Sequence, residues 1–183
     1  MPKNQHVPVN GWPKKGRLIY NWGTTGVWQD GMGDTTGPIE LRELDRGEFF
    51  LAEKLWEQYR GQKADPTNER IFGIFAGGEL AATARYTKHP DGNAMDCVFV
   101  AEKFRGNGYA RHAVEALLAA CGGETIYIHS ILALIGFYKT FGFVAIPEGQ
   151  LPKTIRDRFI FCFGEMEACN VCPMVRMPGG KTD

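Results

Sequence analysis

The feature that most constrains this 183-residue chain is a basic turn with two glycines, which separates a strand-like segment from a helix-like one. The turn reads RGNG at residues 105–108 and follows the apolar segment 98–100. The first N–H groups of a helix lack partners and carry partial positive charge, and glycines let a phosphate approach them closely. The turn predicts an anion site, with a merely tight strand-to-helix turn as the simpler alternative. The helix after it has an apolar face made of Ala110, Val114, Leu117, Leu118 and Cys121.

Two common nucleotide-binding motifs do not fit this turn. A dinucleotide-binding motif needs a third glycine or alanine one residue after Ala110 and a later parallel strand with an acidic end, and a P-loop needs Gly-Lys-Ser or Gly-Lys-Thr. The sequence has neither pattern at this place. We therefore do not expect a nucleotide cofactor of either kind.

The rest of the chain alternates strand-like and helix-like segments and shows no internal repeats. Gly142 is the expected C-terminal cap of one helix, and Pro173 restricts the last strand to an edge or to a late start. The total is about six or seven strands with three or four helices. The expected elements are strands at 39–44, 95–100, 125–130, 143–146 and 171–177, a hairpin at 71–86 around the turn AGGE, and helices at 49–59, 110–121 and 131–140.

Residues 1–37 are expected to be an N-terminal extension of the domain formed by residues 38–183. They are rich in Gly, Pro and Trp and show no sustained helical period. Residues 17–32 fit two short strands around GTTG, or an irregular arm whose tryptophans pack on the domain. The extension gives no indication of function.

A second motif changes the meaning of the glycine turn. Residues 105–110 match the loop Arg/Gln-x-x-Gly-x-Gly/Ala of the GNAT superfamily of acyl-CoA-dependent N-acetyltransferases, and the segment YIHSILALIGFYKTFGF at 127–143 resembles that family's strand and FYexxGF helix. The residues in place in this helix are Phe137, Tyr138, Gly142 and Phe143. The resemblance covers residues 39–146. It implies a mixed α/β (α+β) fold, with a central, mostly antiparallel, splayed sheet flanked by helices.

The resemblance also implies where acetyl-CoA, the acyl donor, would bind. In the family, the strand before the loop splays away from the neighbouring strand, so that its backbone pairs with pantetheine. Val98 and Val100 match the backbone positions that make this pairing. The loop amides would hold the pyrophosphate through the helix-terminus effect described above. These amides belong to Arg105, Gly106, Asn107, Gly108, Tyr109 and Ala110.

Tyr138 matches the tyrosine proposed as general acid for the departing thiolate across much of the family. A tyrosine has a pKa near 10 and a thiol one near 8.5, so full proton transfer would be uphill by about 2 kcal/mol. Tyr138 is therefore expected to donate a hydrogen bond to the sulfur as charge develops, while most of the rate comes from holding amine and thioester together. A core aromatic role is the alternative.

The amine must be neutral to attack, and deprotonating a lysine-like amine at pH 7 costs about 4–5 kcal/mol. His129 matches a histidine in a family subset that reads HAQ there, and it is the candidate base, with a structural histidine as the alternative. Glu40 and Glu79 are further acidic candidates, although surface solvation is the default for both. Ser130 and Ile131 depart from the HAQ subset, which leaves the acceptor open to differ.

Composition narrows the range of partners. Lysine plus arginine and aspartate plus glutamate both number 21, so no net field draws the chain to nucleic acid or to an anionic membrane. The apolar stretches are too short to cross a bilayer, and the N-terminus lacks a signal-peptide core. We expect a cytoplasmic protein without nucleic-acid or membrane partners.

The five cysteines are an odd number and fit a reduced compartment better than a disulfide scaffold. Cys162, Cys169 and Cys172 form C-x6-C-x-x-C, and a zinc site there would need a remote fourth ligand, so no metal is expected. The segment 151–177 is somewhat similar to the cysteine-bearing tail of short amino-acid N-acetyltransferases, which makes amino-acid acetylation a lead.

The expected function is transfer of an acetyl group from acetyl-CoA to a primary amine of a small molecule or amino acid, by direct attack in a ternary complex. The alternative is a non-catalytic module of the same fold that binds acyl-CoA or responds to metal or redox state. A donor with a longer acyl chain and assembly as a homodimer both stay open.

Overall fold

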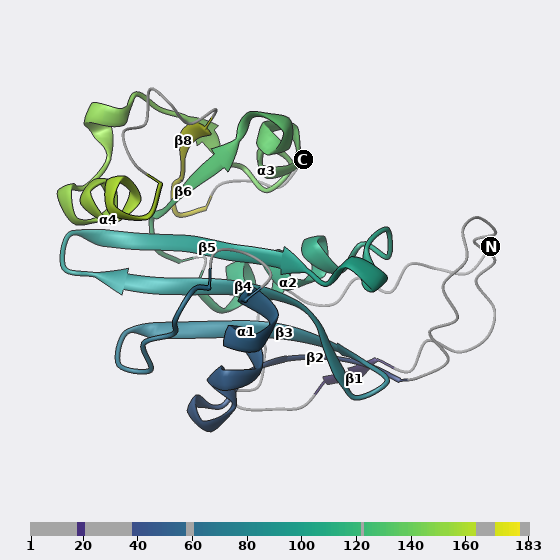
Figure 1. Cartoon of the computed structure of the whole chain (residues 1–183). Helices are drawn as coiled ribbons and strands as arrows, with labels where there is room; N and C mark the ends of the chain where they lie inside the picture. The colour runs from purple at the N-terminus through teal and green to yellow at the C-terminus, as the bar shows by residue number, and fades with distance from the viewer. Residues whose placement is uncertain (1–17, 21–37, 58–60, 122, 164–170, 180–183) are drawn as a thin grey trace, which may run out of the picture.

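The computed structural model describes residues 18–20, 38–57, 61–121, 123–163 and 171–179. Its strands form one sheet with the order β1-β2-β3-β4-β5-β6-β8-β7 (Figure 1). Neighbouring strands are antiparallel except β5 and β6, which are parallel. The strands are β1 (Leu18–Tyr20), β2 (Ile39–Glu43), β3 (Glu69–Ala76), β4 (Glu79–His89), β5 (Gly92–Val100), β6 (Ile126–Ile131), β7 (Val144–Ala145) and β8 (Val171–Arg176).

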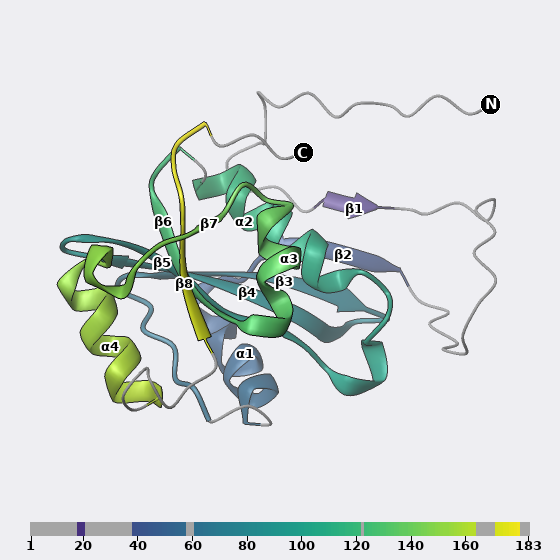
Figure 2. The same cartoon turned by 90° about the horizontal axis from the view of Figure 1, so that it is seen from above.

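The mixed, mostly antiparallel fold predicted from the sequence is confirmed. Among the described residues the sheet has eight strands, and the strand beyond the expected six or seven is β1, a piece of three residues that the sequence left open as strand or irregular arm. Figure 2 shows α1 and α2 on opposite faces of this sheet. The helices are α1 (Phe49–Trp56), α2 (Tyr109–Cys121), α3 (Ile135–Lys139) and α4 (Lys153–Phe163), with 3-10 turns η1 (Arg46–Glu48), η2 (Glu102–Phe104), η3 (Leu132–Leu134) and η4 (Glu148–Gln150).

Helices α1 and α2 bury the faces that their apolar spacing predicts. In α2, Val114 and Leu117 are fully buried, and in α1 Ala52 and Trp56 are fully buried. Tyr59, expected on the same face of α1, lies outside the described residues. The core of the domain is therefore a sheet covered on both sides, which fixes the positions of β4 and β5.

The strands β3, β4 and β5 form a meander whose turns use the expected residues. Gly77 and Gly78 have φ of 59° and 83°, so the turn between β3 and β4 needs glycine at both positions. The strand expected at 95–100 begins earlier, at Gly92, because HPDGN is a tight turn in which His89 pairs with Gly92. The β4–β5 hairpin is thus longer than the sequence pattern indicated.

In the last part of the chain, the helix cap expected at Gly142 is confirmed, and the edge position expected for the last strand is wrong. Gly142, with φ of 80°, donates to the carbonyl of Lys139 and Phe143 donates to that of Tyr138, which together end the α3 segment as expected. The strand β8 exists, but it lies between β6 and β7 and is no edge strand. Pro173 is tolerated there because β7 pairs only with the two residues that follow it.

Helix α4 was not assigned from the sequence. Its N-terminus is capped by another segment, since the Asp91 carboxylate accepts from the backbone N–H of Thr154 at 2.9 Å. A cap from a residue so distant in sequence gives no local signal. Its side chains beyond Arg158 lie outside the described part.

At the other end of the sheet, β1 pairs with β2 and supplies one of the two short strands considered around GTTG. The second of these strands would fall within residues 21–37, outside the described residues. The division of the chain at residue 37 stays a prediction. Among the helices that the structure describes, none is both long and apolar enough to cross a membrane.

Candidate active site

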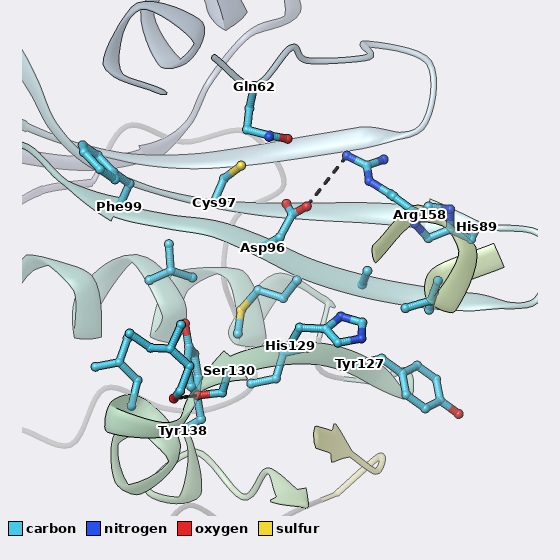
Figure 3. A pocket seen from close by; sticks show the side chains of 17 residues that line it. Gln62, His89, Asp96, Cys97, Phe99, Tyr127, His129, Ser130, Tyr138 and Arg158 are labelled. Carbon is cyan, nitrogen blue, oxygen red and sulfur yellow. Dashed lines mark hydrogen bonds and ion pairs between the residues drawn. The ribbon is translucent and has the colours of Figure 1, made fainter. Parts of the chain in front are cut away.

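The parallel strands β5 and β6 separate soon after they meet, and a cavity occupies the space between them. They pair only at Asn93 with Ile126 and at Ala94 with Tyr127. Beyond these pairs lies a cavity of about 240 Å³, lined by both strands and by residues from α3 and α4 (Figure 3). The splay expected from the sequence is therefore present, and it leaves the β6-facing side of β5 available to a ligand lying along it.

A bulge in β5 marks the centre of this cavity. Arg85 pairs with Asp96 and Thr83 with Phe99, so β5 has one residue more than β4 between these pairs. Cys97 sits in the bulge with φ of 47°, the one positive φ of a non-glycine residue in the described part. The hydroxyl of Thr83 donates to the carbonyl of Cys97 at 2.9 Å, which holds the bulge in place. Val98 follows the bulge and lines the cavity.

The predicted pyrophosphate loop has the conformation that its glycines allow. Gly106 and Gly108 have φ of 86° and 74°, and residues 105–108 are exposed. The Asn107 side chain donates to the carbonyl of Phe104 at 2.9 Å and braces the loop. The first backbone bonds of α2 run from Arg111 and the next residue to the carbonyl of Gly108, so the N–H groups ahead of them have no helical acceptor. The loop thus fits an anionic diphosphate.

Tyr138 reaches the cavity from α3. Its side chain lines the cavity and is 8% exposed, and its ring stands edge-on to Phe137 at 5.1 Å and to Phe143 at 6.0 Å. Arg111 of α2 holds α3 from outside, because its guanidinium donates to the Thr140 hydroxyl at 3.2 Å. The aromatic ring is therefore packed as a core residue would be, while its position at the cavity keeps the acid role open.

His129 reaches the cavity from β6, as expected for a candidate base. Burial lowers the pKa of His129 to about 4, although the nearby charge of Asp96 acts in the opposite direction. A pKa this low lies below the range near neutrality in which a histidine serves best as a general base. The imidazole is neutral at pH 7 and can accept a hydrogen bond there.

A buried charge cluster beside the cavity was not predicted from the sequence. Arg85 is fully buried, and its Nε and Nη2 donate to the two carboxylate oxygens of Asp96 at 2.6 and 2.7 Å. Arg85 also lies 3.3 Å from Glu69, which is 6% exposed. Arg158 of α4 completes the cluster, 3.5 Å from Glu69 and 3.7 Å from Asp96. Figure 3 shows Arg158 and Asp96 at the same side of the cavity.

The pKa values in this cluster follow from burial and pairing. Burial opposes the charge of Asp96, but Arg85 outweighs it and holds the pKa of this carboxyl below its usual value. Burial raises the pKa of Glu69 despite its two arginine neighbours. The sequence did contain a signal, since Arg85 and Asp96 stand in the mostly apolar segments LAATARY and AMDCVFV. A charge at such a position needs a partner or a ligand.

Two acidic candidates are not brought to this site. Glu40 lies 3.2 Å from Arg42, and Glu79 lies 2.6 Å from Lys103, both in ion pairs away from the residues that line the cavity. Neither carboxylate is placed to receive a proton from an amine in the cavity.

One cysteine lies in the cavity itself. Burial, followed by the charge of Asp96, raises the pKa of Cys97, so its thiol stays neutral and is a poor nucleophile. Cys172 on β8 lies opposite Ser130 of β6. The side chain of Cys162 and all of Cys169 fall outside the described residues, and within those residues no three potential ligands gather around a metal position. The expectation that the cysteine-bearing tail binds no metal stays a prediction.

Comparisons with known proteins agree with this geometry. The model of the acetyltransferase (GNAT) family matches residues 38–143. Escherichia coli ElaA matches with a TM-score of 0.57 and 20% identity, over 75% of this chain and 99% of that one. N-acetylglutamate synthase from Neisseria gonorrhoeae, complexed with coenzyme A and L-arginine, matches with a TM-score of 0.59 and 14% identity, over 77% of this chain and 33% of that one.

A third solved structure carries the name of a protein acceptor. The ribosomal-protein-S18-alanine N-acetyltransferase of Escherichia coli matches with a TM-score of 0.55 and 15% identity, over 76% of this chain and 94% of that one. A search of curated proteins found no match. At these identities the solved structures establish a common fold and leave the acceptor open.

Proposed function

This chain belongs to the acetyltransferase (GNAT) family, and from that premise we propose that it transfers an acetyl group from acetyl-CoA to a primary amine of a small molecule or amino acid. The neutral amine nitrogen attacks the thioester carbonyl carbon directly in a ternary complex; the C–S bond breaks, coenzyme A leaves as the thiolate, and the nitrogen releases its surplus proton to solvent. The observation that carries the proposal is the splay of β5 from β6. It opens a cavity along β5, the strand that precedes the glycine loop, and Tyr138 and His129 line this cavity. The neutral thiol of Cys97 argues against an acyl-enzyme route.

The residues around the splay fit the acyl donor. The loop amides of residues 105–110 would hold the diphosphate at the N-terminus of α2, and the backbone around Val98 and Val100 would pair with the pantetheine arm. Once bound there, acetyl-CoA supplies the activated acyl group as a thioester. The gonococcal synthase structures contain coenzyme A, which agrees with this donor.

His129 acts on the neutral amine. Moving a proton from an amine of pKa near 10.4 to an imidazole of pKa about 4 would cost about 9 kcal/mol, more than the 4–5 kcal/mol for losing that proton to water at pH 7. The amine therefore loses its proton to solvent first. His129 then accepts a hydrogen bond from the neutral amine. This bond orients the lone pair of the amine nitrogen toward the thioester.

Tyr138 acts on the leaving group. Its ring is fixed by Phe137 and Phe143, so its hydroxyl has a defined position at the cavity wall. A hydrogen bond to the sulfur strengthens as negative charge develops, and it stabilises the transition state more than the ground state. Tyr138 thus donates a hydrogen bond, with full proton transfer unnecessary.

The test is release of free coenzyme A from acetyl-CoA when the purified chain is given a panel of small amines and amino acids. We expect amine-dependent release with the acetyl group recovered on nitrogen. Binding of acetyl-CoA without release for any amine would favour the non-catalytic module of the same fold. Cytoplasmic location and a homodimer stay predictions that this assay does not address.

A further inference from the structure

We propose that Arg158 forms a carboxylate subsite at the α4 end of the cavity, so that the acceptor is an amine that also carries a carboxylate, such as an amino acid. This inference rests on the proposed acetyl transfer and names the acceptor class. It comes from four features of the chain: the anchoring of α4, the incomplete pairing of Arg158, the charge balance of the cavity, and the closeness of Asp96.

The N-terminal end of helix α4 is anchored to the β4–β5 turn, and this anchoring places Arg158 at the cavity. Asp91, in the β4–β5 turn, accepts from the backbone N–H of Thr154 at 2.9 Å. Gly92 lets the helix approach so closely that a Cβ there would lie 3.0 Å from Pro152 and 3.3 Å from Ile155. Ile155 is 3% exposed and lines the cavity, and Arg158 follows it one turn later on the same face.

The two arginines of the cluster differ in how fully they are paired. Arg85 makes two short bonds to Asp96, a third of 2.8 Å to the carbonyl of Lys63 and a fourth of 3.4 Å to Glu69, so all three of its nitrogens are paired. Arg158 reaches Glu69 and Asp96 through Nη2 alone, at 3.5 and 3.7 Å, in the contacts found among the described residues. Charge-assisted pairs normally measure about 2.7–2.9 Å, so these contacts are loose.

An exposed pair elsewhere shows what a purely structural arginine does in this fold. Arg70 forms a fork with Glu43 at 2.8 and 2.7 Å, although both side chains are about 40% exposed. Arg158 has two carboxylates within reach and forms no such fork with any described residue, while 32% of its side chain remains accessible at the cavity wall. Its guanidinium is therefore placed to take a bidentate carboxylate from a ligand.

The charge balance favours a ligand with both signs. The two arginines and the carboxylates of Glu69 and Asp96 cancel, and burial lowers the pKa of His89 and His129, which keeps both rings neutral. A simple ammonium ion would bring one uncompensated charge into this cavity. An amino acid binds as the zwitterion, with its carboxylate at Arg158 and its ammonium group toward the cavity side of Asp96, so each charge meets its opposite before the ammonium loses its proton to solvent.

The experiment compares common amino acids with their carboxamides, which keep the amine and remove the carboxylate. The rate of acetyl transfer, measured over a range of acceptor concentrations, gives KM and kcat. Calorimetric titration of the coenzyme A-loaded chain with each acceptor measures binding without turnover. The variants are Arg158→Gln, Arg158→Lys and the matched control Arg156→Gln on the same helix. Thermal unfolding of each variant checks that α4 remains docked.

We expect at least one amino acid to be preferred over its carboxamide. Arg158→Gln should raise the KM for that amino acid about 10- to 100-fold and leave the carboxamide unchanged. Arg158→Lys should fall between, because a lysine keeps the charge and loses the fork, while Arg156→Gln should change neither. Equal use of amino acid and carboxamide, or an equal loss of both in Arg158→Gln, would overturn the subsite.

The kinetic and calorimetric measurements together distinguish a failure of the carboxylate subsite from a failure of the proposed acetyl transfer. Amino-acid binding that disappears in Arg158→Gln, without turnover, would support the subsite and contradict acetyl transfer. Turnover of plain amines together with no measurable binding of any amino acid would support acetyl transfer and overturn the subsite.

Discussion

Arg85 on β4 and Asp96 on β5 are directly opposite each other in the sheet and are joined by two short hydrogen bonds, at 2.6 and 2.7 Å. This fork sits immediately before the bulge at Cys97, where β5 turns away from regular pairing. A fully buried guanidinium so joined fixes the register of the two strands on one side of the cavity. The same ion pair therefore stabilises the fold and shapes the wall of the cavity.

Arg85→Met is expected to destabilise the chain by about 3–5 kcal/mol, because Glu69 and Asp96 would lose a buried partner. Arg70→Met is the matched control. It breaks a fork of similar geometry to Glu43 at the surface, and should cost about 1 kcal/mol or less. Urea denaturation of both variants measures the difference. Equal losses would mean that burial of the Arg85 pair does not set its contribution.

Gly108→Val is expected to abolish stabilisation by acetyl-CoA. At about 100 times its dissociation constant, the ligand should add about 2.7 kcal/mol and raise the unfolding midpoint by roughly 5–10 °C. A valine at φ of 74° is strained and stands where the diphosphate approaches. Gly77→Val carries similar strain at φ of 59° in the β3–β4 turn and should keep the shift. Loss of the shift in both variants would point to general unfolding.

Tyr138→Phe is expected to lower kcat about 10- to 100-fold and to leave the KM for acetyl-CoA nearly unchanged. The ring keeps its contacts with Phe137 and Phe143, while the hydrogen bond to the leaving sulfur is lost. Steady-state kinetics with a confirmed acceptor provides the measurement. A variant with the full rate would leave Tyr138 as a core aromatic residue.

Gly92→Val is expected to displace α4, since its side chain would press on Pro152 and Ile155. Overpacking of this kind costs about 1–3 kcal/mol. Gly149→Val is the control, because a Cβ at Gly149 meets nothing within 4 Å. Proteolysis rates at α4 and thermal unfolding report the displacement. If Gly92→Val behaved as the control does, the close docking of α4 on the β4–β5 turn would be contradicted.

The sequence predicted those parts whose causes are local. The glycine turn between β5 and α2 and the end of the α3 segment at Gly142 follow from short patterns, and the structure has them as expected. Helix α4 depends on a cap from Asp91, which lies 63 residues away from Thr154. Arg158 and Asp96 likewise meet only through the folded sheet, so no spacing rule could join them. The low pKa of His129 also depends on burial, which the sequence does not state.

The stability of the chain should depend on His129 between about pH 6.5 and pH 4. The folded state holds the pKa of His129 at about 4, below the unfolded value near 6.5, so the unfolded chain binds a proton first as pH falls. The contribution of His129 is therefore full above pH 6.5 and is lost toward pH 4, by up to about 3 kcal/mol. His129→Gln should flatten this part of the profile. His89, whose pKa burial also lowers, remains in both proteins and contributes equally. Urea midpoints measured at several pH values give both profiles, and parallel curves would show that the imidazole is not buried as described.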